Sequence, residues 1–198
     1  MTGMDRIGEI VEANSIGFIA ESFILHRPPA LGSLVKVQLD ERTIYAVVSF
    51  GTTASIDPGR RAVRRSTDEV YDEAVYREHP QLERTLRTEF QALLVGYRDG
   101  TGPIRQALPP QPPPLHYSVI SCPPDEVRAF TQRRYHFRLL LNAAGELPGD
   151  QLLAAHIRAI YESRGRDDSW LEAAAQDAAA LLRDDYDRMM GVLQSIEP

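Results

Sequence analysis

The chain has 198 residues, a formal net charge of −6, and 43% hydrophobic residues. This length suits one domain, or one domain with an appendage, and the composition is that of a globular protein rather than a disordered one. Lys36 is the only lysine among the 22 basic residues. A phosphate-binding P-loop requires a lysine behind a glycine-rich loop, whereas Lys36 lies in a strand-like segment, so P-loop proteins are excluded.

The cysteine content and the N-terminal residues indicate in which cellular compartment the protein is expected. Cys122 is the only cysteine, so the chain forms no internal disulfide, which suits a reducing compartment. The first residues lack the apolar run of a signal peptide, and no stretch reaches the roughly 18 apolar residues that span a bilayer. We therefore expect a cytoplasmic protein without a membrane segment.

Short strands dominate the first 122 residues. Alternating apolar residues and β-branched or aromatic runs predict six of them. They cover residues 7–12, 17–25, 34–39, 43–50, 90–97 and 116–120. Closely spaced strands with glycine and proline between them favour a small antiparallel barrel over a parallel sheet.

A long polar stretch, residues 51–88, interrupts this series of strands. It contains the turn signal Asp57-Pro58-Gly59 and an acidic segment at residues 68–73. Between these two lies the arginine cluster, which consists of Arg60, Arg61, Arg64 and Arg65. A short helix is predicted to begin with Pro80. We therefore expect a long loop with a helix to be inserted in the barrel.

The pattern changes from strand to helix at Pro123. Pro123 and Pro124, followed by two acids, are typical of a helix start, and one or two helices follow. Asp150 is predicted to cap a helix that ends near residue 161. We thus predict an α+β protein, with a barrel over residues 1–122 and a helical appendage over residues 123–198.

The last helix is predicted to begin near residues 167–169. Apolar residues at steps of three and four give it one apolar face. They are Leu171, Ala175, Ala178, Leu182, Tyr186, Met189, Leu193 and Ile196. With Trp170 and the Met189-Met190 pair, this face is a candidate surface for a partner chain, because methionine-rich surfaces are adaptable. Packing of the helix within its own chain is the default interpretation, and the partner surface is the alternative to it.

The strand pattern resembles a known family, the HAS barrel. This small barrel is shared by HerA-type DNA translocases and the major subunits of rotary ATP synthases. The resemblance lies in Ile7-Gly8-Glu9-Ile10-Val11, Gly17-Phe18-Ile19, Leu31-Gly32-Ser33-Leu34-Val35-Lys36-Val37, Ile44-Tyr45-Ala46-Val47-Val48 and Leu94-Val95-Gly96-Tyr97. Gly8 and Gly32 match glycines of the family, whereas Ala46 stands where the pattern usually has glycine.

The resemblance covers residues 5–122 and implies an assembly role. The segment 51–61 is similar to stand-alone bacterial HAS-barrel proteins, which carry a helical tail and no ATPase domain. In the ATPase families the barrel forms a collar that helps to hold the ring together, and in HerA systems it faces the NurA nuclease. The resemblance thus implies a non-catalytic adaptor for a HerA-like ATPase or its nuclease in DNA repair or end processing, with self-association left open.

The arginine cluster is the strongest local charge feature. Four guanidinium groups on a loop can bind the phosphates of DNA or an acidic partner surface. The alternative is a solvated loop whose charges are balanced by nearby acids, namely Asp68, Glu69, Asp72 and Glu73. The acidity of the whole chain argues against tight binding to nucleic acid.

No catalytic, cofactor-binding or metal-binding residues are predicted. The histidines show no ligand spacing with one another or with the cysteine. They are His26, His79, His116, His136 and His156. Cys122 precedes a helix start, where the helix dipole can lower the pKa of a thiol, but a small buried thiol is the preferred interpretation.

A second functional class remains open, an OB-like barrel that binds single-stranded nucleic acid. Such barrels combine a basic groove with stacking aromatic rings. The spacing of the aromatic residues is more typical of a core and its rim; they are Phe18, Phe23, Tyr45 and Phe50. An enzyme of another type would require a deep polar pocket with perturbed carboxylates.

Overall fold

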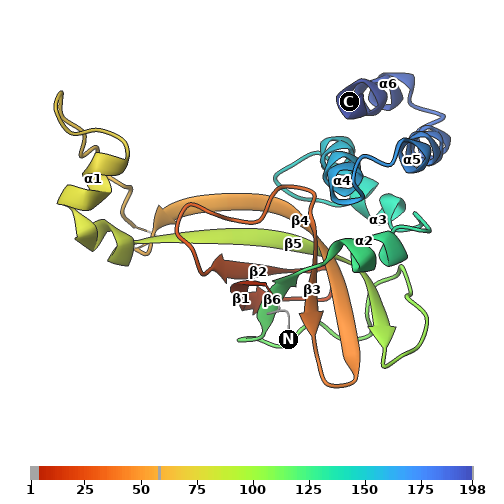
Figure 1. Cartoon of the computed structure of the whole chain (residues 1–198), viewed down its shortest axis with the longest axis horizontal. Helices are drawn as coiled ribbons and strands as arrows, with labels where there is room; N and C mark the ends of the chain where they lie inside the picture. The colour runs from red at the N-terminus through yellow and green to blue at the C-terminus, as the bar shows by residue number, and fades with distance from the viewer. Residues whose placement is uncertain (1–4, 58, 198) are drawn as a thin grey trace.

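The computed structural model describes residues 5–57 and 59–197, and it contains a closed antiparallel barrel of six strands (Figure 1). The strands are β1 (Arg6–Ala13), β2 (Gly17–Ser22), β3 (Leu34–Gln38), β4 (Arg42–Ser55), β5 (Leu86–Asp99) and β6 (Ser118–Ser121). Their order around the barrel is β1-β2-β5-β4-β3-β6, so β6 closes it by pairing with both β1 and β3. The predicted α+β class and N-terminal barrel are confirmed.

Alternate residues of the strands fill the barrel interior. Ile10, Phe18, Val37, Phe90 and Val119 are all buried there and belong to one hydrophobic cluster. Side chains point to opposite faces of a strand in turn, so the neighbouring residues lie on the outer surface of the barrel. The alternation of apolar and polar residues in the sequence therefore arises from this closed core.

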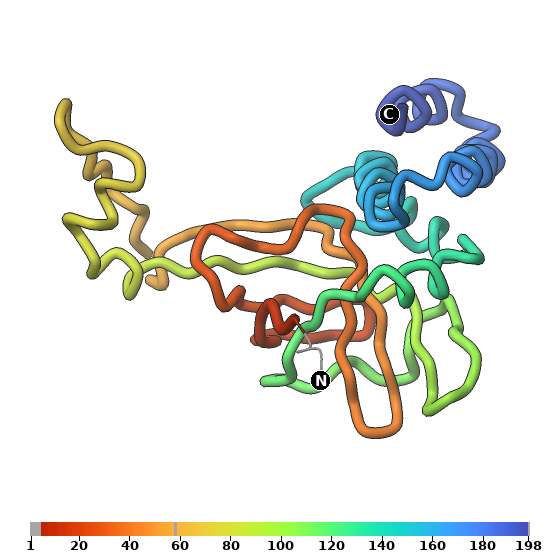
Figure 2. Tube along the Cα trace, viewed as in Figure 1, coloured from red at the N-terminus to blue at the C-terminus, as the bar shows by residue number. Residues whose placement is uncertain are grey.

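The strands β4 and β5 are longer than predicted and extend beyond the barrel. They pair from Arg42 with Asp99 to Ser55 with Leu86, and they carry α1 (Glu73–Glu78) and η1 (Pro80–Arg84) at their far end. Figure 2 shows this hairpin leaving the barrel and returning to it. We call residues 51–88 the arm.

The prediction that the whole arm would be loop and helix is therefore wrong at its two ends, where residues 51–55 belong to β4 and residues 86–88 to β5. Residues 51–54 are exposed although they are paired in a strand. A two-stranded ribbon with water on both faces needs no apolar alternation, so this part of β4 carried no strand signal. The short helix at Pro80 is confirmed as a 3₁₀ helix with proline at its first position. Pro58 of the predicted turn lies outside the described residues, but Asp57 Oδ1 accepts a hydrogen bond from the Gly59 N–H at 3.0 Å.

Five helices follow the barrel within the described residues, up to residue 197. They are α2 (Pro124–Phe130), α3 (Phe137–Leu141), α4 (Gly149–Ser163), α5 (Asp168–Leu181) and α6 (Tyr186–Ile196). Asp150 does not cap α4, since Pro148 occupies the N-cap position and Asp150 lies in the first turn. Among the described residues, no helix is both long and apolar enough to cross a membrane.

The single terminal helix predicted from the apolar pattern is wrong, because the chain breaks between α5 and α6. Leu182 is the C-cap of α5, and the Asp185 side chain caps α6 by accepting a hydrogen bond from the Arg188 N–H at 3.2 Å. The apolar spacing runs through the break without a gap, so the pattern alone gives no sign of it. The break lets α6 fold back onto α4, where Val192 and Ile196 are buried.

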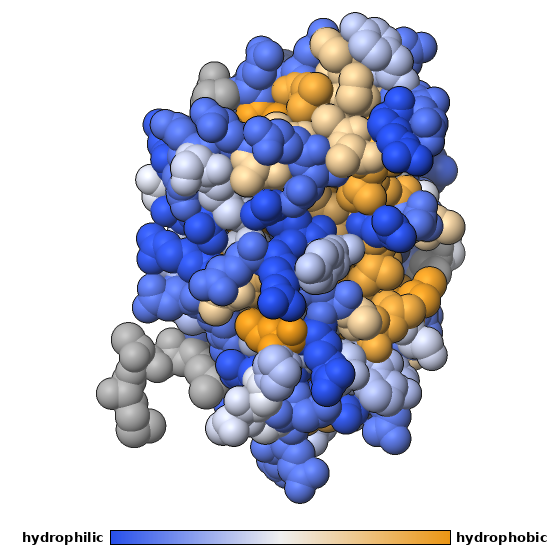
Figure 3. All heavy atoms as spheres, turned by 90° about the vertical axis from the view of Figure 1, so that its right-hand side faces the viewer, coloured by the Kyte–Doolittle hydropathy of each residue, from blue (hydrophilic) through white to orange (hydrophobic). Residues whose placement is uncertain are grey.

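A second hydrophobic cluster joins the outer face of the barrel to the helices. Leu34, Tyr45 and Val95 from the strands share it with Phe130 and Ile157 from α2 and α4. The helices gather on one side of the barrel, away from the arm (Figure 1), and apolar residues surface between hydrophilic ones on that side (Figure 3). We call this cluster the joint; it fixes the helices to the barrel through buried contacts rather than through a linker.

Candidate functional site

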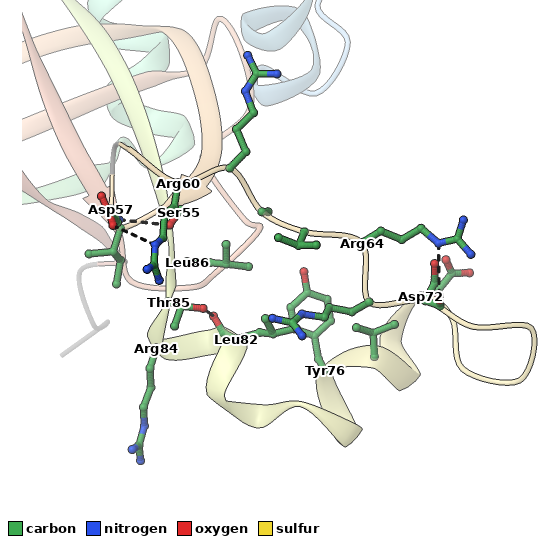
Figure 4. Close-up of a pocket in the computed structure, with 17 residues that line it drawn as sticks. Ser55, Asp57, Arg60, Arg64, Asp72, Tyr76, Leu82, Arg84, Thr85 and Leu86 are labelled. Carbon is green, nitrogen blue, oxygen red and sulfur yellow. Dashed lines mark hydrogen bonds and ion pairs between the residues drawn. The ribbon is translucent and has the colours of Figure 1, made fainter.

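A groove in the arm brings the arginine cluster together with side chains from α1 and η1. It has a volume of about 670 Å³, and all four arginines of the cluster line it. Tyr76 and Leu82 contribute from the opposite side, and Arg84 extends away from the groove (Figure 4). A ring contact joins α1 to the loop between β2 and β3. The rings of Tyr76 in α1 and His26 in that loop pack edge to face, with centroids 5.1 Å apart. The four arginines that the sequence analysis singled out therefore line one groove.

The acids of the solvated-loop alternative form no ion pair with the arginine cluster among the described residues, although Asp72 lines the same groove. Within residues 5–57 and 59–197, Arg60 pairs with Asp57 at 3.7 Å, and no ion pair joins Arg61, Arg64 or Arg65 to a carboxylate. All four arginines are exposed. Because exposed pairs contribute little, even the Arg60–Asp57 pair leaves its guanidinium available to a partner.

The only lysine and a glutamate form a half-buried ion pair between the barrel and α2. Lys36 Nζ donates to Glu126 Oε2, and both side chains are only 13–14% exposed. Tyr45 completes the group, because its hydroxyl donates to Glu126 Oε1 at 2.8 Å. Burial, reinforced by the bond to Glu126, raises the pKa of the Tyr45 hydroxyl. Sequence reasoning missed this group, because its members are separated by up to 90 positions.

We expect Glu126→Gln to lower the free energy of unfolding by about 3 kcal/mol, because Lys36 would keep its charge in a half-buried site without a counterion. The matched control is Asp125→Asn in the same turn of α2, where the carboxylate is almost fully exposed. That change should cost less than about 1 kcal/mol. Urea unfolding of both variants makes the comparison, and equal losses would show that the Lys36–Glu126 pair has no special role.

Cys122 lies beside the same group. Burial, followed by the nearby charge of Glu126, raises the pKa of its thiol. This environment opposes activation of the thiol by the helix dipole, because desolvation disfavours the thiolate. The buried-thiol interpretation agrees with this environment.

Two histidines that are 20 positions apart meet inside the joint. His136 and His156 are fully buried, and their Nε2 atoms are 2.9 Å apart. His156 Nδ1 lies 2.6 Å from the Gly32 carbonyl oxygen, so Nδ1 carries the proton and donates. Its Nε2 then accepts from His136 Nε2–H. This arrangement holds the pair together when both rings are neutral.

Burial lowers the pKa of both histidines. The pKa of His136 lies well below its ordinary value, because burial is reinforced by the nearby His156 and Arg134. The pKa of His156 is lowered to about 4, although its bond to Gly32 opposes the shift. His136 Nδ1 is buried without a hydrogen-bond partner among the described residues. Sequence reasoning missed this pair, since the spacing of its members matches no metal-ligand pattern.

The structure places the proposed partner face of the terminal helix largely inside the chain. Trp170 is 5% exposed, and its Nε1–H donates to the Thr131 carbonyl at 2.9 Å. Met189 packs against the joint, and Met190 is half-buried. For Trp170 this is the packing within its own chain that the sequence analysis took as the default.

The barrel aromatics do not form one exposed surface. Phe18 and Tyr45 are buried, whereas Phe23 is 54% exposed. A stacking platform for single-stranded nucleic acid needs several exposed rings in succession, so these residues do not supply one.

No group of three or more histidine, cysteine, aspartate or glutamate residues is placed to hold a metal ion within the described part of the chain. No protein-family model matches the chain, and no curated protein matches it in sequence.

Proposed function

We propose that this protein is a non-catalytic assembly or adaptor protein that associates with a HerA-like hexameric DNA translocase and a NurA-type nuclease in DNA repair or end processing. The arm is the observation that carries the proposal. It holds the arginine cluster away from the barrel at the end of a paired hairpin (Figure 1). Such an element adds nothing to either hydrophobic cluster and is suited to contact with another molecule.

The exposed apolar side chains of the arm support a protein partner. Val63 is 72% exposed and Tyr71 is 62% exposed, and both lie close in sequence to the arginine cluster. Interfaces between proteins combine apolar and aromatic anchors with arginine, whereas binding to a phosphate backbone needs mainly positive charge. Acidic side chains at the same groove, Asp57 and Asp72, would repel a nucleic acid.

The closed barrel also favours the arm as the contact. A closed barrel leaves no strand edge for a partner strand to pair with. Beyond the barrel, the outer parts of β4 and β5 pair with each other and, among the described residues, with no other strand. The identity of the partners rests on the resemblance of the strands to HAS barrels.

The test is co-purification from cells that naturally produce the protein. The tagged chain is expected to recover a hexameric translocase and a nuclease, and a variant with glutamine at all four positions of the arginine cluster should recover at least about tenfold less of them. The matched control is Arg27→Gln/Arg128→Gln/Arg166→Gln/Arg183→Gln, which changes four exposed arginines outside the arm. Absence of both enzymes from the wild-type sample would refute the proposed partners.

A further inference from the structure

The turn between α2 and α3, residues 131–136, presents a second basic surface at the opposite end of the molecule from the arm. The side chains of Arg133 and Arg138 are exposed, and so is Arg105 from the neighbouring β5–β6 loop. Tyr135 lies between the two arginines in the sequence and is 70% exposed. We call these four residues the basic turn.

The backbone of this turn is held firmly from several sides. The Gln106 side-chain amide donates to the carbonyls of Phe130 and Arg133, each at 2.7 Å. Arg134 is anchored to Asp177 at 2.6 Å, and the indole of Trp170 donates to the Thr131 carbonyl. The exposed side chains therefore project from a fixed backbone, which lowers the entropy that a partner would have to remove on binding.

Two hollows flank the turn. One has a volume of about 680 Å³ and the other about 630 Å³, and Arg133 and Tyr135 line both of them. Apolar residues at their walls, Leu181 in the first and Ile104 in the second, allow each hollow to take an apolar side chain.

The charge of this surface is opposite to that of the chain as a whole. Arginines of the turn and the β5–β6 loop line the hollows, and the single carboxylate at them, Asp177, is already paired with Arg134. Within the described residues, Arg105, Arg133 and Arg138 form no ion pair within 4 Å. Arginine and tyrosine are also the side chains most enriched where protein interfaces gain their binding energy.

We propose that the basic turn is a docking site for an acidic segment of a partner protein, with carboxylates on the arginines and apolar side chains in the two hollows. A single exposed ring provides no run of stacked bases, so the surface fits such a segment better than single-stranded nucleic acid. Because the arm and the basic turn lie at opposite ends (Figure 1), the site allows the protein to hold two partners at once. It stands whether or not those partners are a translocase and a nuclease.

The experiment uses the full purified chain and two labelled probes in fluorescence anisotropy at low salt. One is a 12-residue peptide of glutamate, leucine and glycine, and the other is a 12-nucleotide oligothymidylate. The peptide should bind with a Kd of the order of micromolar to tens of micromolar. Arg133→Glu/Arg138→Glu should weaken its binding at least about tenfold, because both changes place like charges against the peptide.

The control, Arg27→Glu/Arg183→Glu, makes the same change in net charge at exposed sites elsewhere and should change the affinity less than about twofold. Tyr135→Ala, which leaves the net charge unchanged, should weaken binding about threefold to tenfold. If the charge-reversed variant does not fold, Arg133→Gln/Arg138→Gln gives the same readout. Equal losses in both charge-reversed variants, tighter binding of the oligonucleotide, or no binding of the peptide would each overturn the proposal.

Discussion

Gly32→Ala is expected to lower the free energy of unfolding by about 4 kcal/mol or more, because the added methyl group would meet both a left-handed backbone and a steric clash. Gly32 has φ +80°, and a Cβ at this position would lie 2.4 Å from the Ala155 carbonyl carbon and 2.5 Å from the His156 nitrogen. Both are backbone atoms in the middle of α4, so no side chain can move aside. The barrel and the helix would have to separate at the joint.

Gly165→Ala provides a closely matched control. Gly165 has φ +77°, but a Cβ there meets no heavy atom within 4 Å. Only the cost of a left-handed alanine remains, about 1 kcal/mol. Urea unfolding followed by the fluorescence of Trp170, the only tryptophan, measures both variants. Equal losses in the two would mean that α4 can move away from the barrel at no cost.

Acidification is expected to weaken the joint through the histidine pair. The pKa of His156 is about 4 in the folded chain, below its ordinary value of 6.5, so the unfolded chain binds more protons in this range. The resulting stability is complete above pH 6.5 and is lost as the pH falls towards 4. For a shift of this size the loss is on the order of 3 kcal/mol, and the shift of His136 acts in the same direction.

The measurement is the free energy of unfolding as a function of pH, compared with a His136→Gln/His156→Gln variant. Carboxylates also titrate near pH 4, so the comparison is made between pH 6.5 and 5, where the variant should show the shallower slope. If the variant does not fold, imidazole ¹⁵N shifts of the wild-type protein should show both rings neutral at pH 5.5. A charged ring at that pH, or equal slopes, would contradict the prediction.

Both predictions concern the contact that fixes the helices to the barrel. Gly32 lies in the loop before β3 and accepts the hydrogen bond from His156 of α4, so the close approach and the histidine pair belong to one arrangement. Since the basic turn follows α2 on the helical side and the arm extends from the barrel, the joint also sets how the two proposed contacts are oriented.

The sequence predicted those elements that bury one face. The alternation in β1, β3 and β5 reflects the closed core of the barrel, and the acids after Pro124 mark the start of α2. The apolar pattern did not predict the outer part of β4, because both faces of that ribbon meet water. It also did not predict the break between α5 and α6, because the apolar spacing continues across it. The arginine cluster was found because its four members are neighbours in the chain.

The sequence by itself determined that the protein has a small barrel followed by helices, that it contains one lysine and one cysteine, and that an exposed arginine cluster interrupts the strands. Only the tertiary structure decided which of these features contact one another. It paired the one lysine with Glu126 across 90 positions and buried two histidines against each other. The physical reason is that secondary structure follows from the burial pattern of neighbouring residues, whereas ion pairs, close backbone contacts and surfaces depend on which distant segments pack together.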